Sequence, residues 1–193
     1  MHPVLELLLS NIHFAAPITN YLRDWKPLPI HILLLQLLNL LAPHSYSSLQ
    51  NKPAAASDAP SRVLYVANHC LTGLDAPLVV AGIHQQTGNW PRALAHAALL
   101  RFPTKHVMNR LGVVNASPSV CAALMDLGQP ILVFPGGARE ALRKKGEDAY
   151  SLHWRDGFAR MAIQHNYTIV PVASTGLPEM LSILADMPSG LLL

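Results

Sequence analysis

Charged residues are scarce in this chain of 193 residues. Lysine, arginine, aspartate and glutamate make up 13% of it, against about a quarter in an ordinary soluble domain. The net charge is +3, and no long basic run accompanies it, which argues against nucleic-acid binding. Hydrophobic residues make up 51%, and the mean hydropathy is +0.26. This composition indicates either one domain with an unusually large core or a domain that meets lipid.

Cysteine is nearly absent as well. Cys70 and Cys121 are too few for a disulfide framework and lack metal-site spacing, so we expect a reduced compartment. The sequence has no His-Glu-x-x-His and no Cys-x-x-Cys, so we expect no metal site. It also lacks the Gly-x-Ser-x-Gly elbow of a serine hydrolase. A cysteine hydrolase is disfavoured because Cys70 directly follows His69 and would point elsewhere.

The N-terminal segment, residues 1–42, is apolar, and no lysine or arginine precedes its first apolar run, unlike a signal peptide. Within it, a helix over Ile30–Leu41 would be about 18 Å long, too short for a hydrocarbon core of about 30 Å. Trp25 and Lys26 precede this helix, as residues at a membrane interface often do. The segment is therefore either a helix lying in the interface or a core helix.

Residues 43–61 are rich in Ser, Ala and Pro and predict a linker or surface loop. From residue 62 onward, β-rich runs alternate with helical patterns, so we expect one domain over 62–193. We expect strands at 62–68, 111–116, 129–135 and 167–174, and helices at 75–88, 117–128 and 154–166. The alternation predicts an α/β fold, with a mainly parallel central sheet flanked by helices and an N-terminal apolar helical segment.

Polar residues of chemical interest follow three of the expected strands, and ligands bind at the carboxyl ends of parallel strands. Asn68 and His69 follow the first strand, "PGGARE" follows the third, and "VASTG" includes the end of the last. His69 with Asp75 would make a general base and the carboxylate that orients it. The spacing is not helical, so Gly73 has to form a turn that brings them together. The alternative is a capped helix beside a buried histidine.

The stretch "PGGARE" permits close approach to a ligand. Gly136 and Gly137 let the backbone adopt unusual angles and present its N–H groups. Arg139 has a planar fork that binds phosphate or carboxyl oxygens, and Glu140 can orient it. We therefore predict a substrate-binding set of Asn68, Gly136, Gly137, Arg139 and Glu140. The alternative is a glycine turn followed by a surface ion pair.

Taken together, "NH…D", "FPGGARE" and "IVPV" resemble the glycerolipid acyltransferase superfamily over about residues 62–180. The double glycine with Arg-Glu, and "WRDGFARMAI" after it, look like its branch of diacylglycerol acyltransferases and phytyl ester synthases. The resemblance implies acyl transfer from a thioester such as acyl-CoA, or from a lipid donor, to an alcohol, with no bound cofactor. It implies His69 as the base and Asp75 as its partner. Backbone N–H groups near Gly136 and Gly137 would stabilise the oxyanion, and Arg139 would hold the acceptor or the donor's phosphates.

Two departures from the family pattern favour different conclusions. Five residues, rather than the family's four, separate His69 from Asp75, and this spacing favours a non-catalytic lipid-binding relative as one alternative. The run "GVVNASPSV" lacks the arginine of phosphate-handling members, which favours an acceptor without phosphate, diacylglycerol or a long-chain alcohol. A lipase-like hydrolase of the same fold, with water replacing the alcohol, is the other alternative.

The expected partners are lipid substrates and a membrane surface, with no nucleic acid. We expect a membrane-associated, intracellular protein. The sequence ends in "MPSGLLL" soon after the Val-Pro strand, whereas the resembled family continues further. We therefore expect residues 62–193 to form a C-terminally incomplete domain with an exposed sheet edge or a partly open substrate tunnel.

Overall fold

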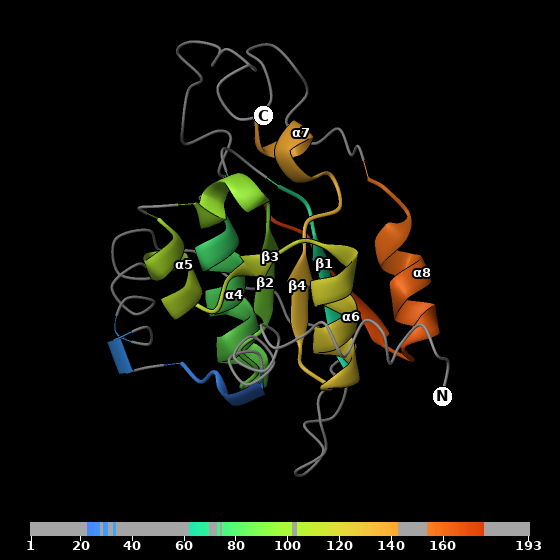
Figure 1. Ribbon diagram of the computed structural model, residues 1–193, viewed down its shortest axis with the longest axis horizontal. Coiled ribbons are helices and arrows are strands. Elements are labelled where there is room, and N and C mark those ends of the chain that lie inside the picture. Colours follow the sequence, from blue (N-terminus) through green and yellow to red (C-terminus); the bar gives the residue numbers. More distant parts are fainter. Residues whose placement is uncertain are drawn as a thin grey trace, which may run out of the picture.

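The computed structural model describes residues 23–27, 29–30, 33, 62–69, 73, 75–101, 104–142 and 154–175. Their strands are β1 (Val63–Ala67), β2 (Arg92–Ala95), β3 (Val114–Asn115), β4 (Ile131–Val133) and β5 (Thr168–Val172). Their helices are α4 (Asp75–Thr87), η2 (Ala97–Leu100), α5 (Lys105–Arg110), α6 (Pro118–Asp126), α7 (Gly137–Ala141) and α8 (Gly157–Gln164). The sheet order is β3-β2-β4-β1-β5, and all neighbouring strands are parallel (Figure 1). The predicted parallel α/β fold is confirmed.

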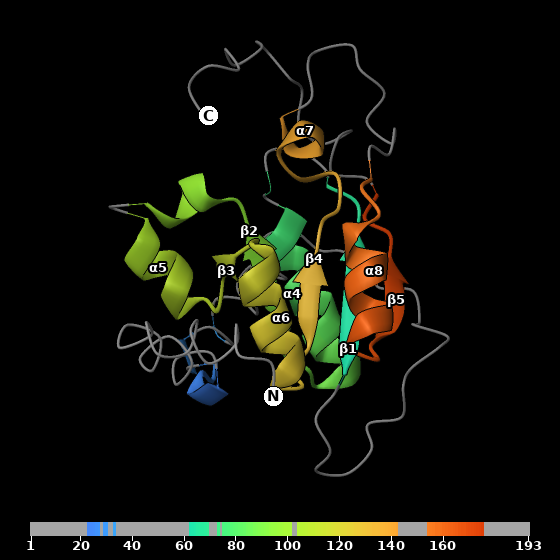
Figure 2. The same ribbon diagram turned by 45° about the vertical axis from the view of Figure 1, so that its right-hand side comes forward.

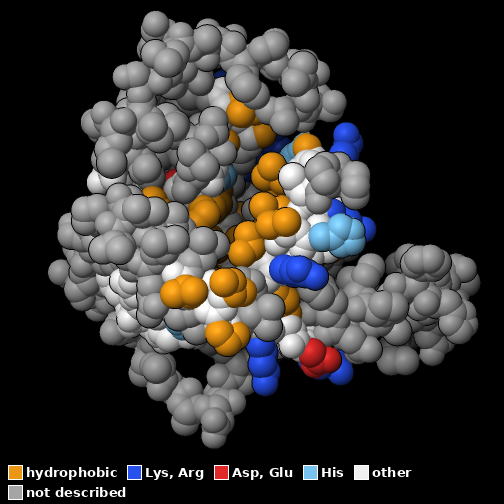
Figure 3. Space-filling model, turned by 90° about the vertical axis from the view of Figure 1, so that its left-hand side faces the viewer, with side chains coloured by type: hydrophobic (Ala, Val, Ile, Leu, Met, Phe, Trp, Pro, Cys, Tyr) orange, Lys and Arg blue, Asp and Glu red, His pale blue; other side chains and the backbone are white. Residues whose placement is uncertain are grey.

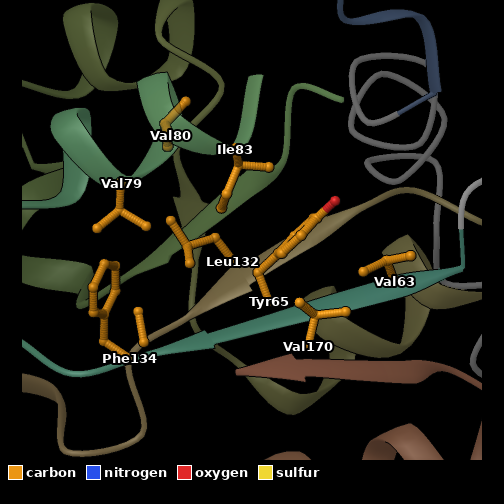
Figure 4. Close-up of a cluster of buried hydrophobic side chains, with 9 residues drawn as sticks. Val63, Tyr65, Val79, Val80, Ile83, Leu132, Phe134 and Val170 are labelled. Carbon is orange, nitrogen blue, oxygen red and sulfur yellow. The ribbon is translucent and has the colours of Figure 1, made fainter. Parts of the chain in front are cut away.

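The sheet has a helical layer on each face because its strands alternate their side chains. In β1, Leu64 and Val66 pack with α6 and α8, whereas Val63 and Tyr65 face α4. Figure 2 shows α6 and α8 in front of the sheet and α4 behind it. Figure 4 shows the cluster on the α4 side, where side chains from three strands meet those of the helix. All five residues of β1 are buried, as expected for a strand covered on both faces.

The predicted elements recur with shifted ends, and two of the helices have typical capping residues. The hydroxyl oxygen of Ser117 accepts a hydrogen bond from the N–H of Val120 at 3.3 Å, which makes Ser117 the cap of α6. Gly88 and Gly128 follow α4 and α6 with positive φ. β2, η2, α5 and α7 were not predicted from the sequence. β2 reads Arg-Ala-Leu-Ala and has no β-branched residue, so it lacks the composition that predicts a strand.

The predicted N-terminal apolar helical segment and the linker after it lie almost entirely outside the described residues. Both stay predictions. Within the described part of the chain, no helix combines the length and the apolar character that a membrane crossing needs.

Tyr167 links the end of α6 to the start of β5. Its hydroxyl group donates to the carbonyl oxygen of Gln129 at 2.9 Å, and the carbonyl oxygens of Leu124 and Met125 lie within 3.4 Å. The ring is buried in the α6/α8 core cluster. Burial raises the pKa of Tyr167 well above its ordinary value, so the hydroxyl keeps its proton and stays a donor.

Tyr167→Phe should therefore lower the free energy of unfolding by about 1 kcal/mol, because it removes the hydroxyl donor to the carbonyl oxygen of Gln129. Urea denaturation followed by circular dichroism measures the change. An unchanged midpoint would show that the hydroxyl group contributes nothing net.

Candidate active site

Three chain segments meet at the carboxyl edge of the sheet. β4, β1 and β5 are adjacent and parallel, so the segments that follow them leave the sheet at one edge. These segments are 68–69 after β1, 134–136 after β4, and 173–175 after β5. α7 lies above the ends of β1 and β4 in both ribbon views (Figures 1 and 2). The edge is the one where the sequence places the candidate residues.

His69 and Asp75 contact each other at this edge. Nδ1 of His69 lies 3.1 Å from Oδ1 and 3.3 Å from Oδ2 of Asp75. Because an ionised carboxylate only accepts hydrogen bonds, Nδ1 carries the proton and Nε2 is the basic nitrogen. Gly73 has a φ of +81° and makes the turn between the two residues, as the sequence required. The contact is the geometry that the hypothesis of a base and its orienting carboxylate needs.

Burial distinguishes this pair from an ordinary surface contact. Asp75 begins α4 and is 0% exposed, whereas the side chain of His69 is 14% exposed. The chain has a second histidine–aspartate pair, His165 with Asp126, at 3.0 Å. There the carboxylate is 72% exposed and water screens it. A buried carboxylate needs hydrogen-bond partners to offset its lost hydration. Asp75 therefore restrains the ring of His69 more strongly than the exposed Asp126 restrains that of His165.

Phe134 fixes the plane of the imidazole ring. The rings of His69 and Phe134 stack with centroids 3.9 Å apart and planes 8° from parallel. Phe134 is itself buried among the α4-side core residues. One face of the imidazole is therefore covered by the core, and its rotation is restricted.

The motif "FPGGARE" also holds the main chain of His69. Oε2 of Glu140 accepts a hydrogen bond from the backbone N–H of His69 at 3.1 Å, and Glu140 is fully buried. A Cβ atom on Gly136 would collide with the carboxyl group of Glu140. Gly137 has a φ of +53°, and its N–H donates to the carbonyl oxygen of Phe134 at 3.0 Å. Gly136 thus leaves room for the carboxyl group of Glu140, and Gly137 adopts the positive φ of the turn into α7.

Two predicted substrate-binding residues, Asn68 and Glu140, contact the main chain of other segments. Glu140 was expected to orient Arg139, but its carboxylate reaches His69 while Arg139 is exposed on α7. Nδ2 of Asn68 donates to the carbonyl oxygen of Ser174 at 2.9 Å, and Oδ1 accepts from the N–H of Ser174 at 2.8 Å. Asn68 therefore ties the end of β1 to the end of β5. Both side chains are buried, and their substrate-binding role stays a prediction.

Sequence reasoning assigned no role to Phe134 or to Ser174. Phe134 stands inside the quoted motif, so its position was visible, but its stacking on His69 depends on the pairing of β4 with β1. Ser174 contacts Asn68 through main-chain atoms, which carry no signal in a sequence. Within the described ranges, no three His, Cys, Asp or Glu residues gather closely enough to hold a metal ion.

Comparisons with known proteins match this chain to an enzyme family. The family model described as "Acyltransferase" matches residues 46–175. Phytyl ester synthase 1, chloroplastic, of Arabidopsis thaliana is 32% identical over 64% of this chain and 19% of its own length. Phytyl ester synthase 2, chloroplastic, of the same plant is 30% identical over 72% of this chain and 20% of its own. Diacylglycerol O-acyltransferase 2B of Umbelopsis ramanniana is 33% identical over 48% and 28%. The chain thus spans about a fifth of the length of the two plant relatives, and no solved structure matches it.

The two glycines of the motif allow a matched test of the contact between Glu140 and His69. Gly136→Ala should displace Glu140 and lower the free energy of unfolding by about 1–3 kcal/mol, the usual cost of overpacking. Gly137→Ala should cost about 1–2 kcal/mol from its positive φ alone, since no atom lies within 4 Å of a Cβ there.

Hydrogen exchange at the backbone amide of His69 separates the two variants. It should speed up in Gly136→Ala, which loses the carboxylate partner, and stay slow in Gly137→Ala. Equal exchange in both would contradict the role given to Gly136.

Proposed function

Because the chain belongs to the acyltransferase family, we propose that it moves a fatty acyl group from a thioester or lipid donor to the hydroxyl group of a lipid alcohol. One observation carries the proposal. His69 contacts the fully buried Asp75 at the carboxyl edge of a parallel sheet, where such folds bind their ligands.

In the proposed reaction, His69 is the general base. Its Nε2 takes the proton from the acceptor hydroxyl while the hydroxyl oxygen attacks the carbonyl carbon of a donor such as acyl-CoA. The C–O bond forms, the C–S bond breaks, and the imidazolium returns the proton to the leaving thiolate. The products are an ester and a free thiol, with no acyl-enzyme. Asp75 holds the Nδ1–H tautomer and stabilises the imidazolium.

The remaining residues divide into positioning and binding groups. Glu140 and Phe134 position His69 from its main chain and from its ring face. The N–H of Gly137 is bonded to Phe134, which leaves Gly136 as the proposed oxyanion donor of the two. Arg139 is exposed at the same edge, and we assign to it the donor's phosphates or the acceptor.

The proposed acceptor is diacylglycerol or a long-chain alcohol, with no phosphate of its own. The stretch 112–120, which includes β3, has no arginine. The matched relatives bear the names of a phytyl ester synthase and a diacylglycerol O-acyltransferase, both of which describe esters of phosphate-free alcohols. Lipid substrates of this kind reside in bilayers, so we propose a membrane-associated protein.

His69→Ala should lower acyl transfer by at least about a hundredfold, because a positioned base contributes about 10²- to 10⁴-fold. The matched control is His165→Ala, which removes the contact between His165 and Asp126 at the opposite end of the sheet. It should transfer acyl groups at the rate of the unaltered protein.

The assay offers acyl-CoA with diacylglycerol, a fatty alcohol, phytol or lysophosphatidate, and separates the esters formed. Transfer by His69→Ala at the original rate would overturn the mechanism. Ester formation on lysophosphatidate alone would overturn the acceptor, and release of free fatty acid without ester would make the chain a hydrolase.

Glu140 acts through His69 and touches no reacting atom in this mechanism, so its substitution should lower kcat and leave KM unchanged. Glu140→Gln keeps an oxygen acceptor for the His69 N–H and should retain activity within about tenfold. Glu140→Ala loses the acceptor and should lose about a hundredfold, the cost of a displacement of about 1 Å. Steady-state kinetics on variants with unchanged circular dichroism measure both, and a rise in KM would instead place Glu140 against substrate.

A further inference from the structure

η2 and α5 lie against each other, and their residues are exposed or only partly buried. Neither helix has a buried residue. Thr104 ties them together, because its hydroxyl group donates to the carbonyl oxygens of Leu99 and Arg101 at 2.8 and 2.9 Å. Leu99 on η2 is 50% exposed, and Val107 on α5 is 56% exposed. Two adjoining short helices therefore present large apolar side chains to the outside.

The charged residues from η2 to the end of α5 are all basic. No aspartate or glutamate occurs between Asp75 and Asp126. Arg101, Lys105 and Arg110 are all exposed on this stretch. Figure 3 shows this side of the molecule, with hydrophobic side chains in a band, lysine, arginine and histidine side chains beside it, and an acidic side chain next to basic ones at its lower end. An apolar surface flanked by basic side chains is complementary to a bilayer with anionic headgroups.

Trp25 extends this face with a segment from far away in the sequence. Its indole Nε1–H donates to the carbonyl oxygen of Arg110, the last residue of α5, at 3.2 Å. Its ring lies under the guanidinium group of Arg92, 4.8 Å from the centroid. Ile30 and Leu33 are each 59% exposed a few residues further on. The segment that Trp25 anchors beside α5 thus adds further apolar side chains, together with one exposed acid, Asp24.

The face also borders the candidate active site. β2 is parallel to β4 and β1, so η2, which follows β2, leaves the sheet at the same edge as His69. A lipid entering from a surface at η2 and α5 would reach the edge at which the base lies.

We propose that the docking face, defined as Leu99, Arg101, Lys105, Val107 and Arg110, seats the domain on an anionic lipid bilayer. Leu99 and Val107 enter the acyl boundary, and the three basic side chains contact the headgroups. This inference rests on the proposed function only in taking the substrates to be lipids. Binding to vesicles without substrate tests it separately from catalysis.

The test uses the whole chain in co-sedimentation with two kinds of vesicle, phosphatidylcholine alone and equal parts of phosphatidylcholine and phosphatidylglycerol. The protein should bind the mixed vesicles more tightly, by about fivefold for each basic residue near the surface. Lys105→Gln with Arg110→Gln should weaken that binding about 25-fold. Leu99→Ser with Val107→Ser should weaken it by at least about tenfold on both kinds of vesicle.

The matched control is Ile163→Ser on α8. Ile163 is 82% exposed, more than Leu99 or Val107. Its surroundings differ from the docking face, because an aspartate and an arginine, Asp156 and Arg160, form an ion pair on the same stretch. All substituted residues are exposed, so the fold stays intact, and circular dichroism verifies it. Ile163→Ser should bind vesicles like the unaltered protein.

Equal binding to both vesicles, equal losses in Ile163→Ser and the Leu99/Val107 variant, or no loss in the latter would each overturn the proposal. Vesicle binding without acyl transfer would keep the docking face and overturn the proposed function. Acyl transfer to soluble acceptors without vesicle binding would keep the proposed function and overturn the docking face.

Discussion

The buried carboxylate of Asp75 is the constraint on which the candidate site depends. A carboxylate with no exposure to water is tolerated only where hydrogen-bond donors face it. His69 supplies a donor, and its ring is held in turn by Phe134 on one face and by Glu140 at the main chain. A second fully buried carboxylate, Glu140, thus faces the same residue. Two fully buried acids thus contact one histidine. The pair of His165 and Asp126 has no buried carboxylate, because Asp126 is mostly exposed.

This arrangement gives the motif "FPGGARE" a reading that its composition does not suggest. Double glycines at the end of a strand usually indicate a backbone that approaches a ligand. Here Gly136 is small because Glu140 occupies the space beside it, and Gly137 turns the chain into α7. The phenylalanine and the glutamate of the motif both contact His69, which lies 65 and 71 residues before them in the chain. The arginine that precedes the glutamate is exposed to solvent. Most of the motif therefore serves the histidine.

Much of the fold was readable from the sequence because its signals are local. Ser117 and Pro118 start α6, glycines end α4 and α6, and apolar β-rich runs mark β1, β4 and β5. β2 escaped because an alanine-rich strand lacks that signal, and its pairing with β4 is a long-range property. The His69–Asp75 contact followed from residue types and a glycine between them. The partners of Asn68 and Glu140 did not, because both are main-chain groups brought near by parallel pairing of distant strands.

The stacking of Phe134 on His69 has a consequence for the order in which this protein becomes competent. β1 and β4 pair in the register Val66 to Val133, which sets the residues just beyond them side by side. Side chains alternate along a strand, so a slip of one residue would turn Phe134 to the opposite face of the sheet. The slip would also shift α7, which follows β4, and so move Glu140 away from the main chain of His69. The site therefore exists only in chains whose central strands have found their final alignment. A partly folded chain, whether newly synthesised or refolding after stress, contains His69 but does not hold it as an oriented base.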